Sequence, residues 1–189
     1  MSKFENTILL QGPISTWTKY IVNEYTEKHP DAQILISTWT NENIDDISCE
    51  VVFSEPPSIP KPFKSTVNFQ IVGTQTGLKE VRGEHVLKCR TDQFIHNKEI
   101  FQFFKNFCPD DKIMIPNLGT YEHRQYRVSD FCQLATKSNL LKYWEKIPLF
   151  DGKKPIDGGT YITENYVIKI KNEKLSWRKA LRKYFFVVD

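Results

Sequence analysis

The stretch HVLKCRTDQF, residues 85–94, begins as an apolar strand and ends in charge. Charged residues occupy every second position along it, at Lys88, Arg90 and Asp92. Because successive side chains of a strand point to opposite faces, these three charges share one face. Burying an unpaired charge is costly, so this strand end needs charged partners or a charged ligand.

Strand and helix patterns alternate on both sides of this stretch. Short apolar runs predict strands, and apolar residues at helical spacing predict helices. The predicted strands are residues 7–12, 32–38, 49–55, 85–94 and 112–117, and the predicted helices are residues 15–30, 66–83 and 97–108. This alternation predicts an α/β fold with a mostly parallel central sheet flanked by helices, in a single domain over residues 1–189.

Several local features refine this prediction. Residues 129–147 are predicted to form one helix, or two helices with a break near Ser138, and residues 163–172 are also predicted to be helical. Residues 185–189 predict a final strand, and the four prolines in 54–64 predict an extended surface loop. Ser15 is the expected N-cap of the first helix. Two apolar helix faces are expected: Trp17, Tyr20, Ile21 and Tyr25 in the first helix, and Ile100, Phe103, Phe104 and Phe107 in the third.

Composition excludes some classes of protein. The net charge of +3 is too small to indicate a nucleic-acid partner, and the apolar content of 40% is ordinary for a globular protein. No stretch approaches the roughly 20 apolar residues that span a bilayer, and the first twelve residues are too polar for a signal peptide. A cytoplasmic location is therefore the default expectation. The four cysteines lack CxxC spacing, which favours buried free thiols over a zinc site or a disulfide framework.

Two strand ends carry candidate site residues, because ligands of open α/β sheets bind at the carboxyl ends of the strands. Gln11, Gly12 and Pro13 form a turn directly after the first strand, where glycine admits a ligand and the glutamine amide can read a base edge. A plain strand-to-helix turn explains the same residues. Neither a GxGxxG nor a P-loop motif is present.

The second candidate is the charged end of the fourth strand. Asp92 could place a carboxylate oxygen on a divalent metal, while Arg90 and Lys88 could contact a diphosphate. The alternative is a solvated edge strand whose charges pair with one another. The pattern leaves both readings open.

A resemblance rests on several short motifs in order: ILLQGPI (8–14), ILISTW (34–39), NFQIVGTQTGL (68–78), HVLKCRTD (85–92) and YRVSDF (126–131). Together they resemble the WavE-type lipopolysaccharide-synthesis family over roughly residues 7–145. That family is similar to GT-A glycosyltransferases, which use a nucleotide-sugar donor and often a divalent metal. The resemblance implies a GT-A-like fold and transfer of a sugar to a glycan or lipid-linked acceptor.

The resemblance also implies roles for the matching residues. The nucleotide-sugar site would comprise Gln11, Gly12, Pro13, Ser37, Trp39, Gln70, Lys88 and Arg90. Asp92 would bind Mn²⁺ or Mg²⁺, and Asp130 is the candidate base for an inverting transfer. For Asp130 the alternative is an N-cap of the following helix, paired with Gln133 in a capping box.

The chain departs from the family pattern at two points. Phe69 stands where the family has an arginine, and the acidic motif holds one aspartate instead of two. A related nucleotidyltransferase or a non-catalytic nucleotide-sugar or glycan-binding module therefore remain alternatives. A nucleotidyltransferase is less expected, since no glycine-rich basic loop follows the first strand.

The C-terminal segment 166–189 is basic and amphipathic. Trp177, Leu181, Tyr184 and Phe185 share one helical face, with lysines and arginines around it. Such a helix can lie on an anionic membrane, which would suit a lipid-linked acceptor. Alternatively, it packs its apolar face on the domain.

Overall fold

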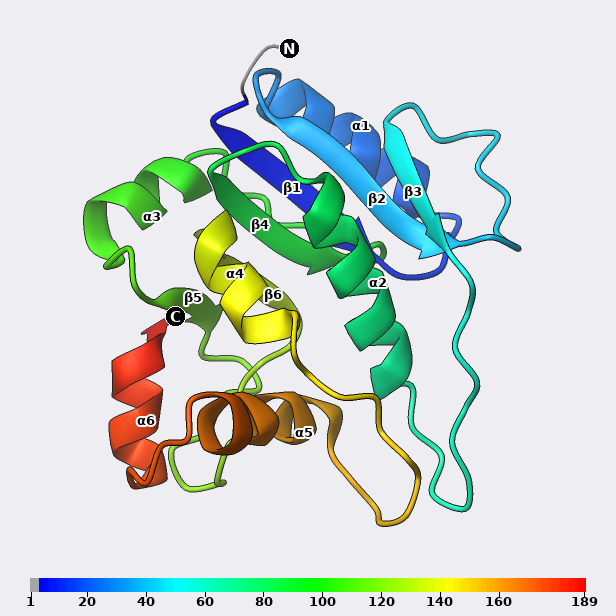
Figure 1. Cartoon of the computed structure of the whole chain (residues 1–189). Coiled ribbons are helices and arrows are strands. Elements are labelled where there is room, and N and C mark those ends of the chain that lie inside the picture. Colours follow the sequence, from blue (N-terminus) through cyan, green and yellow to red (C-terminus); the bar gives the residue numbers. More distant parts are fainter. Residues whose placement is uncertain (1–3) are drawn as a thin grey trace.

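The computed structural model describes residues 4–189 and shows one seven-stranded sheet in the order β3-β2-β1-β4-β6-β5-β7 (Figure 1). The strands are β1 (Asn6–Gln11), β2 (Gln33–Trp39), β3 (Glu50–Ser54), β4 (His85–Arg90), β5 (Ile113–Pro116), β6 (Cys132–Thr136) and β7 (Phe185–Val188). All neighbouring pairs are parallel except those of β6, which runs antiparallel to β4 and β5. The predicted α/β fold with a mostly parallel sheet is confirmed.

Strand order reverses at β1, which lies between β2 and β4. The chain runs from β1 outward to β2 and β3, then crosses back to form β4 on the other side of β1. The two crossovers leave the sheet in opposite directions, and a crevice opens outside the carboxyl ends at such a point. Both candidate strand ends lie here, because β1 ends at Gln11 and β4 at Arg90.

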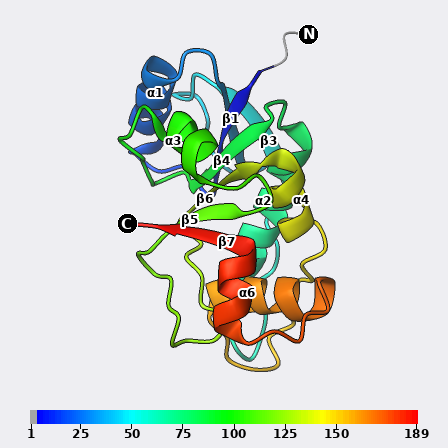
Figure 2. The same cartoon turned by 90° about the vertical axis from the view of Figure 1, so that its left-hand side faces the viewer.

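Helices cover both faces of the sheet, as the side view in Figure 2 shows. The helices are α1 (Thr18–Lys28), α2 (Val67–Glu80), α3 (Ile100–Phe107), α4 (Lys137–Trp144), α5 (Gly158–Glu164), the π-helical η1 (Asn165–Ile170) and α6 (Trp177–Tyr184). Helices α1 and α3 lie on one face, and α2 and α4 lie on the other (Figure 2). The sheet therefore separates two hydrophobic cores.

Strand β1 shows how the sequence builds these two cores. Leu9 packs with the α2 and α4 side, whereas Ile8 and Leu10 pack with the α1 and α3 side, as the two-residue period of a strand requires. All three side chains are fully buried. Each contributes about 1.5–3 kcal/mol of hydrophobic stabilisation, and their apolar run is typical of a strand covered on both faces.

The predicted helix over residues 129–147 is wrong in its first half. Residues 132–136 form strand β6, which fills the sheet between β4 and β5, and tertiary pairing here overrides the local helical spacing. Helix α4 begins at Lys137, where the Thr136 hydroxyl accepts a hydrogen bond from the Asn139 amide. Neither the single helix nor the two helices with a break near Ser138 are present, and the capping box of Asp130 is also wrong.

Two predicted helix faces also need correction. In α1, Ile21 and Tyr25 are buried but Trp17 and Tyr20 are exposed, and the helix begins at Thr18 instead of after Ser15. The predicted α3 face is also turned: Phe104 is buried as expected, and Phe101 and Cys108 take the inner positions, while Phe103 and Phe107 face outward. Runs of adjacent aromatic residues offer two overlapping helical stripes, and packing on the sheet selects one.

Helix α6 and strand β7 pack onto the domain. Trp177, Leu181, Tyr184 and Phe185 are all buried in the larger core, and β7 pairs with β5. The apolar face expected at a membrane is thus used inside the protein. Within residues 4–189, no helix has the length and apolar character needed to cross a membrane.

Candidate functional site

A cavity of about 470 Å³ opens at the carboxyl ends of β1, β2 and β4, beside the start of α2. Seven of the ten predicted site residues line it: Gln11, Gly12, Pro13, Trp39, Gln70, Arg90 and Asp92. The other three, Ser37, Lys88 and Asp130, lie outside its lining. The structure thus gathers residues that are up to 81 positions apart into one place.

The turn after β1 depends on glycine. Gly12 has a φ of +140°, and a Cβ atom there would lie 2.9 Å from the Thr91 hydroxyl oxygen. The Gly12 amide donates to the Ser37 carbonyl, and the Thr91 hydroxyl donates to the Pro13 carbonyl at 2.6 Å. The turn therefore fastens the end of β1 to the ends of both neighbouring strands, with its backbone facing the cavity.

Gln11 is buried between β1 and α2. Its Nε2 donates to the Phe69 carbonyl at 3.3 Å. Gly73 allows this contact, because a Cβ atom there would lie 2.8 Å from Gln11 Cγ. Ser37 is fully buried, and its hydroxyl donates to the Gly73 carbonyl at 2.7 Å, so it holds α2 against β2.

An aromatic pair forms one wall of the cavity. Trp39 and Phe69 pack edge to face with ring centroids 5.1 Å apart, and both line the cavity. Phe69, which stands where the resemblance implies an arginine, thus contributes an apolar surface. Aromatic faces of this kind can pack against a nucleobase or a sugar ring.

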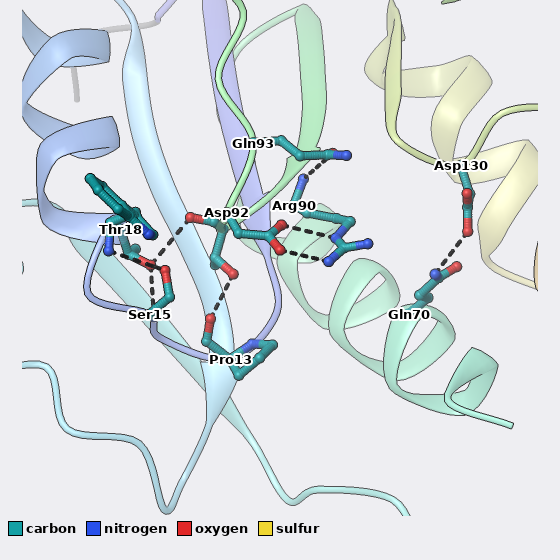
Figure 3. Close-up of polar contacts among 10 residues, drawn as sticks. Pro13, Ser15, Thr18, Gln70, Arg90, Asp92, Gln93 and Asp130 are labelled. Atoms are coloured by element: carbon teal, nitrogen blue, oxygen red, sulfur yellow. Dashed lines mark hydrogen bonds and ion pairs between the residues drawn. The ribbon is translucent and has the colours of Figure 1, made fainter. Parts of the chain in front are cut away.

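Arg90 and Asp92 form a two-pronged ion pair at the cavity mouth (Figure 3). Arg90 Nε lies 2.9 Å from Asp92 Oδ1, and Arg90 Nη2 lies 2.6 Å from Asp92 Oδ2. Both side chains are 43% exposed, so the pair stabilises the fold by about 0–1 kcal/mol. Arg90 and Asp92 pair with each other, as expected for the alternative of a solvated edge strand. The strand, however, is central in the sheet and ends beside a cavity.

Lys88, two residues earlier on the same face, is completely buried. Its Nζ donates to the Asp130 backbone carbonyl at 3.3 Å and lies 5.2 Å from the centre of the Trp144 ring. Burial lowers the pKa of Lys88, and the Asp130 charge opposes that shift only in part. Lys88 therefore braces the segment before β6 instead of reaching the cavity.

Asp130 is linked to the cavity through one side chain. Its Oδ2 accepts a 2.8 Å hydrogen bond from Gln70 Nε2, which comes from α2 (Figure 3). The other amide atom, Gln70 Oε1, is buried and has no hydrogen-bond partner among residues 4–189. A buried acceptor without a partner is costly, so a ligand or water donor at this point would be stabilising.

The structure adds residues that the sequence reasoning missed. Glu42 lines the cavity three residues after β2, and its Oε2 accepts from the Ile14 amide at 2.9 Å. Thr91 also lines it, between Arg90 and Asp92. Position in the loop that follows a predicted strand was the available signal for Glu42, because the carboxyl ends of parallel strands share one edge of the sheet.

The donor set allows one kind of metal site. No group of three His, Cys, Asp or Glu side chains that could hold a metal ion occurs in the part of the chain that the structure describes. Mg²⁺ is commonly bound by one or two carboxylates, with phosphates and water completing its shell. Asp92 keeps free lone pairs beside its two bonds to Arg90, so it fits a metal held mostly by substrate phosphates.

Solved structures show the same fold at low sequence identity. The chain is similar to a 4-diphosphocytidyl-2C-methyl-D-erythritol synthase from Anaerococcus prevotii DSM 20548, with 13% identity, a TM-score of 0.54 and coverage of 98% of this chain and 88% of that one. A nucleotidyl transferase from Methanothermobacter thermautotroptrophicus has 11% identity, a TM-score of 0.54 and coverage of 85% and 81%. A putative glucose-1-phosphate thymidylyltransferase from Bacillus anthracis has 10% identity, a TM-score of 0.52 and coverage of 97% and 87%.

Sequence comparisons give the family. No curated protein matches the chain. The family described as WavE lipopolysaccharide synthesis matches residues 7–184, which is almost the full sequence. The match extends well beyond the motifs around the cavity and includes β6, α5 and α6. The chain therefore belongs to the WavE lipopolysaccharide synthesis family.

Proposed function

We propose that this protein is a glycosyltransferase that moves a sugar from a nucleotide-sugar donor to a glycan or lipopolysaccharide-type acceptor. The observation that carries the proposal is the convergence of seven predicted residues on one cavity at the strand-order reversal. Membership of a lipopolysaccharide-synthesis family supports the same class of chemistry.

The nucleoside half of the donor fits the part of the cavity between β1, β2 and α2. Trp39 and Phe69 supply an aromatic wall, and the Gly12 turn brings backbone close to the ligand. Gln11 has its amide nitrogen bonded to Phe69, which leaves its carbonyl oxygen as the group able to accept from a base.

The diphosphate belongs at the Arg90 and Asp92 side. Arg90 uses two nitrogens on Asp92 and keeps further N–H donors for phosphate oxygens. Asp92 would hold the divalent metal. When bound, that metal would supply positive charge to stabilise the departing nucleoside diphosphate.

Asp130 is the candidate base for the acceptor hydroxyl. It is partly exposed, and its bond to Gln70 fixes one carboxylate oxygen toward the cavity side of α2. The acceptor would then approach between Gln70 and the segment before β6, and its hydroxyl proton would pass to Asp130 as the sugar is transferred.

A nucleotidyltransferase is the second candidate, because two of the solved structures above are named a nucleotidyl transferase and a putative thymidylyltransferase. Its triphosphate substrate needs a cradle of backbone amides and cations. The loop after β1, residues 12–17, holds one glycine and no lysine or arginine. This loop favours the glycosyltransferase over the nucleotidyltransferase.

A lipid-linked acceptor would bring the protein to an anionic membrane surface. Because the apolar face of α6 is buried, contact through this helix would rest on its exposed cations. Arg178 and Arg182 already lie close to Glu122, which reduces the charge available. Membrane contact by this route would be weak and sensitive to salt.

Product analysis separates these candidates. The purified protein would be incubated with a panel of nucleotide sugars, with and without Mn²⁺, and free nucleoside diphosphate would be measured. A parallel set with nucleoside triphosphates and sugar phosphates would be assayed for inorganic diphosphate. The proposal expects the first product and not the second, and ligand binding with neither product would indicate a binding module.

A further inference from the structure

Two of the four cysteines face each other across the strands that carry the candidate site. Cys89 on β4 is the direct partner of Cys132 on the antiparallel strand β6. Both are free thiols, and both pack against the core on the α1 and α3 side. They were 43 positions apart in the sequence, so no spacing motif indicated the pair.

Backbone hydrogen bonds show whether Cys89 and Cys132 form a hydrogen-bonded or a non-hydrogen-bonded antiparallel pair. The N–H and C=O of one strand residue point to the same side, and Thr91 donates to Gln11 on β1. Alternate residues of β4, including Cys89, therefore bond to β1. The His85 amide likewise donates to the Glu5 carbonyl beside β1, so the even-numbered positions of β4 are the ones that bond to β6. Cys89 and Cys132 thus form a non-hydrogen-bonded antiparallel pair.

This geometry suits a disulfide bond. Cα atoms in such a pair lie about 4.5 Å apart, closer than in a hydrogen-bonded pair. Disulfides span Cα separations of about 4.4–6.8 Å, so the two sulfurs can join with little backbone movement. The other cysteines, Cys49 and Cys108, lie on different elements and have no such partner among the described residues.

The surroundings favour a thiolate within the pair. The neighbouring Cys132 thiol lowers the pKa of Cys89, whereas Cys89 and burial raise the pKa of Cys132. The Tyr25 hydroxyl adds a second donor, 3.8 Å from the Cys89 sulfur, and is itself positioned by the Ile95 amide. By contrast, burial raises the pKa of both Cys49 and Cys108 to about 12.

A small molecule can reach this pair. Cys132 is partly exposed and lines a hollow of about 530 Å³, while Cys89 lies fully buried behind it. Phe94, Ile95 and Leu118 give the hollow a largely apolar lining. The hollow therefore fits a small apolar reagent better than a charged one.

We propose that Cys89 and Cys132 form a thiol-modification site that closes into an intramolecular disulfide on contact with a small apolar disulfide. The Cys89 thiolate takes the proton of the neighbouring Cys132 thiol, and the Cys132 sulfur then attacks one sulfur of the reagent. Half of the reagent leaves as a thiolate. Cys89 then passes its proton to that first thiolate and attacks the Cys132 sulfur, and the second half of the reagent leaves as a thiolate that takes a proton from water. Two protein thiols are oxidised, and the reagent disulfide is reduced to two thiols.

The closed disulfide would join the strand that ends at Arg90 to the strand that follows Asp130. It would close a loop of about 40 residues and restrict the unfolded chain, so the oxidised protein should melt at a higher temperature than the reduced protein. This inference does not depend on the proposed enzymatic reaction.

The test uses the full chain with Cys49→Ser and Cys108→Ser, which keeps only the pair. The folded protein is treated with dithiodipyridine and its intact mass is measured. The proposal expects a loss of two hydrogens and release of two thiopyridones per chain. A stable pyridylthio adduct on either cysteine, or no reaction, would overturn it.

Two further samples protect the test against a folding defect. Wild-type protein is treated in the same way, digested and mapped, and a linked peptide pair containing residues 89 and 132 is expected. The Cys89→Ser variant should retain one pyridylthio adduct on Cys132, because the second attack is removed. Linkage through Cys49 or Cys108, or an unmodified Cys132 in this variant, would contradict the proposal.

Discussion

Gln70 on α2 donates a 2.8 Å hydrogen bond to the carboxylate of Asp130, which precedes β6. One partner lines the candidate donor cavity, and the other does not. Helix α2 therefore connects the donor side to the carboxylate proposed as the base. Since Asp130 is not the cap of α4, a strictly structural role in capping is removed from consideration.

Asp130→Asn is expected to lower turnover at least a hundredfold while donor affinity stays within a few-fold, because general base catalysis typically contributes 10²–10⁴-fold. Asparagine still accepts from Gln70, so the free energy of unfolding should change by about 1 kcal/mol or less. Turnover and donor affinity are measured on the same preparation. Asp151→Asn, an exposed carboxylate paired with Lys153, is the matched control. Turnover within a few-fold of wild type would remove Asp130 from the reaction.

Asp92→Asn is expected to abolish the metal-dependent part of donor binding and to leave the fold intact. The reason is that Asp92 is the one predicted metal ligand, while its ion pair with Arg90 is too exposed to matter for stability. Nucleoside diphosphate is titrated with Mn²⁺ and with a chelator, for wild type and variant. Asp46→Asn removes a comparable exposed pair with Lys19 and serves as the control. Equal metal dependence in both proteins would exclude Asp92 as a ligand.

Gly12→Ala is expected to destabilise the protein by about 1–3 kcal/mol, since alanine is strained at a φ of +140° and its Cβ would meet the Thr91 hydroxyl. Donor affinity should fall as well, because the same turn faces the cavity. Denaturant unfolding measures the first effect. Gly158→Ala is the control, because the nearest atom to its Cβ would be 3.7 Å away. A similar loss of unfolding free energy in both variants would show that the turn does not require glycine at position 12.

The Lys88→Met variant tests whether the buried ammonium group destabilises the fold in a way that depends on pH. Burial lowers the pKa of Lys88 in the folded protein below its usual 10.5, so the unfolded chain binds more protons. The cost of Lys88 is therefore full below its folded pKa and disappears as pH rises to about 10.5. Methionine should be as stable as lysine or more stable near neutral pH, and its advantage should shrink as pH rises.

Urea unfolding of both proteins, at about pH 7 and about pH 10, measures that difference. A constant gap between the two curves would show that Lys88 does not titrate as burial requires. Donor affinity supplies a second readout. Because Lys88 lies outside the cavity, affinity in Lys88→Met should stay within a few-fold of wild type.

Local patterns were enough for the strands and helices around the cavity. The apolar run of β1 and the helical spacing of α2 depend on neighbours along the chain, and these two elements bring Gln11, Gly12 and Gln70 to the cavity. The prediction failed for strand β6 because this segment becomes a strand by pairing with β4, which lies over 40 positions earlier in the sequence. In so short a segment, the spacing of apolar residues does not distinguish a strand from the start of the helix that follows it.

The sequence also did not allow us to predict which of the charged side chains would be buried. Lys88, Arg90 and Asp92 share a face, as predicted, yet Lys88 is buried and the other two are half exposed. The difference arises because Trp144 of α4 lies over Lys88, whereas Arg90 and Asp92 line the cavity. Only the tertiary packing of α4 determines which of the three faces solvent.

The most direct test of the proposed function measures nucleoside diphosphate released from a panel of nucleotide sugars by wild type and by Arg90→Lys, with acceptor glycan present. Lysine keeps the charge but loses the two-pronged fork that holds Asp92 and reaches phosphate. The proposal predicts release from at least one donor by wild type and a reduction of tenfold or more by the variant. No release from any donor, or inorganic diphosphate released from nucleoside triphosphates instead, would contradict it.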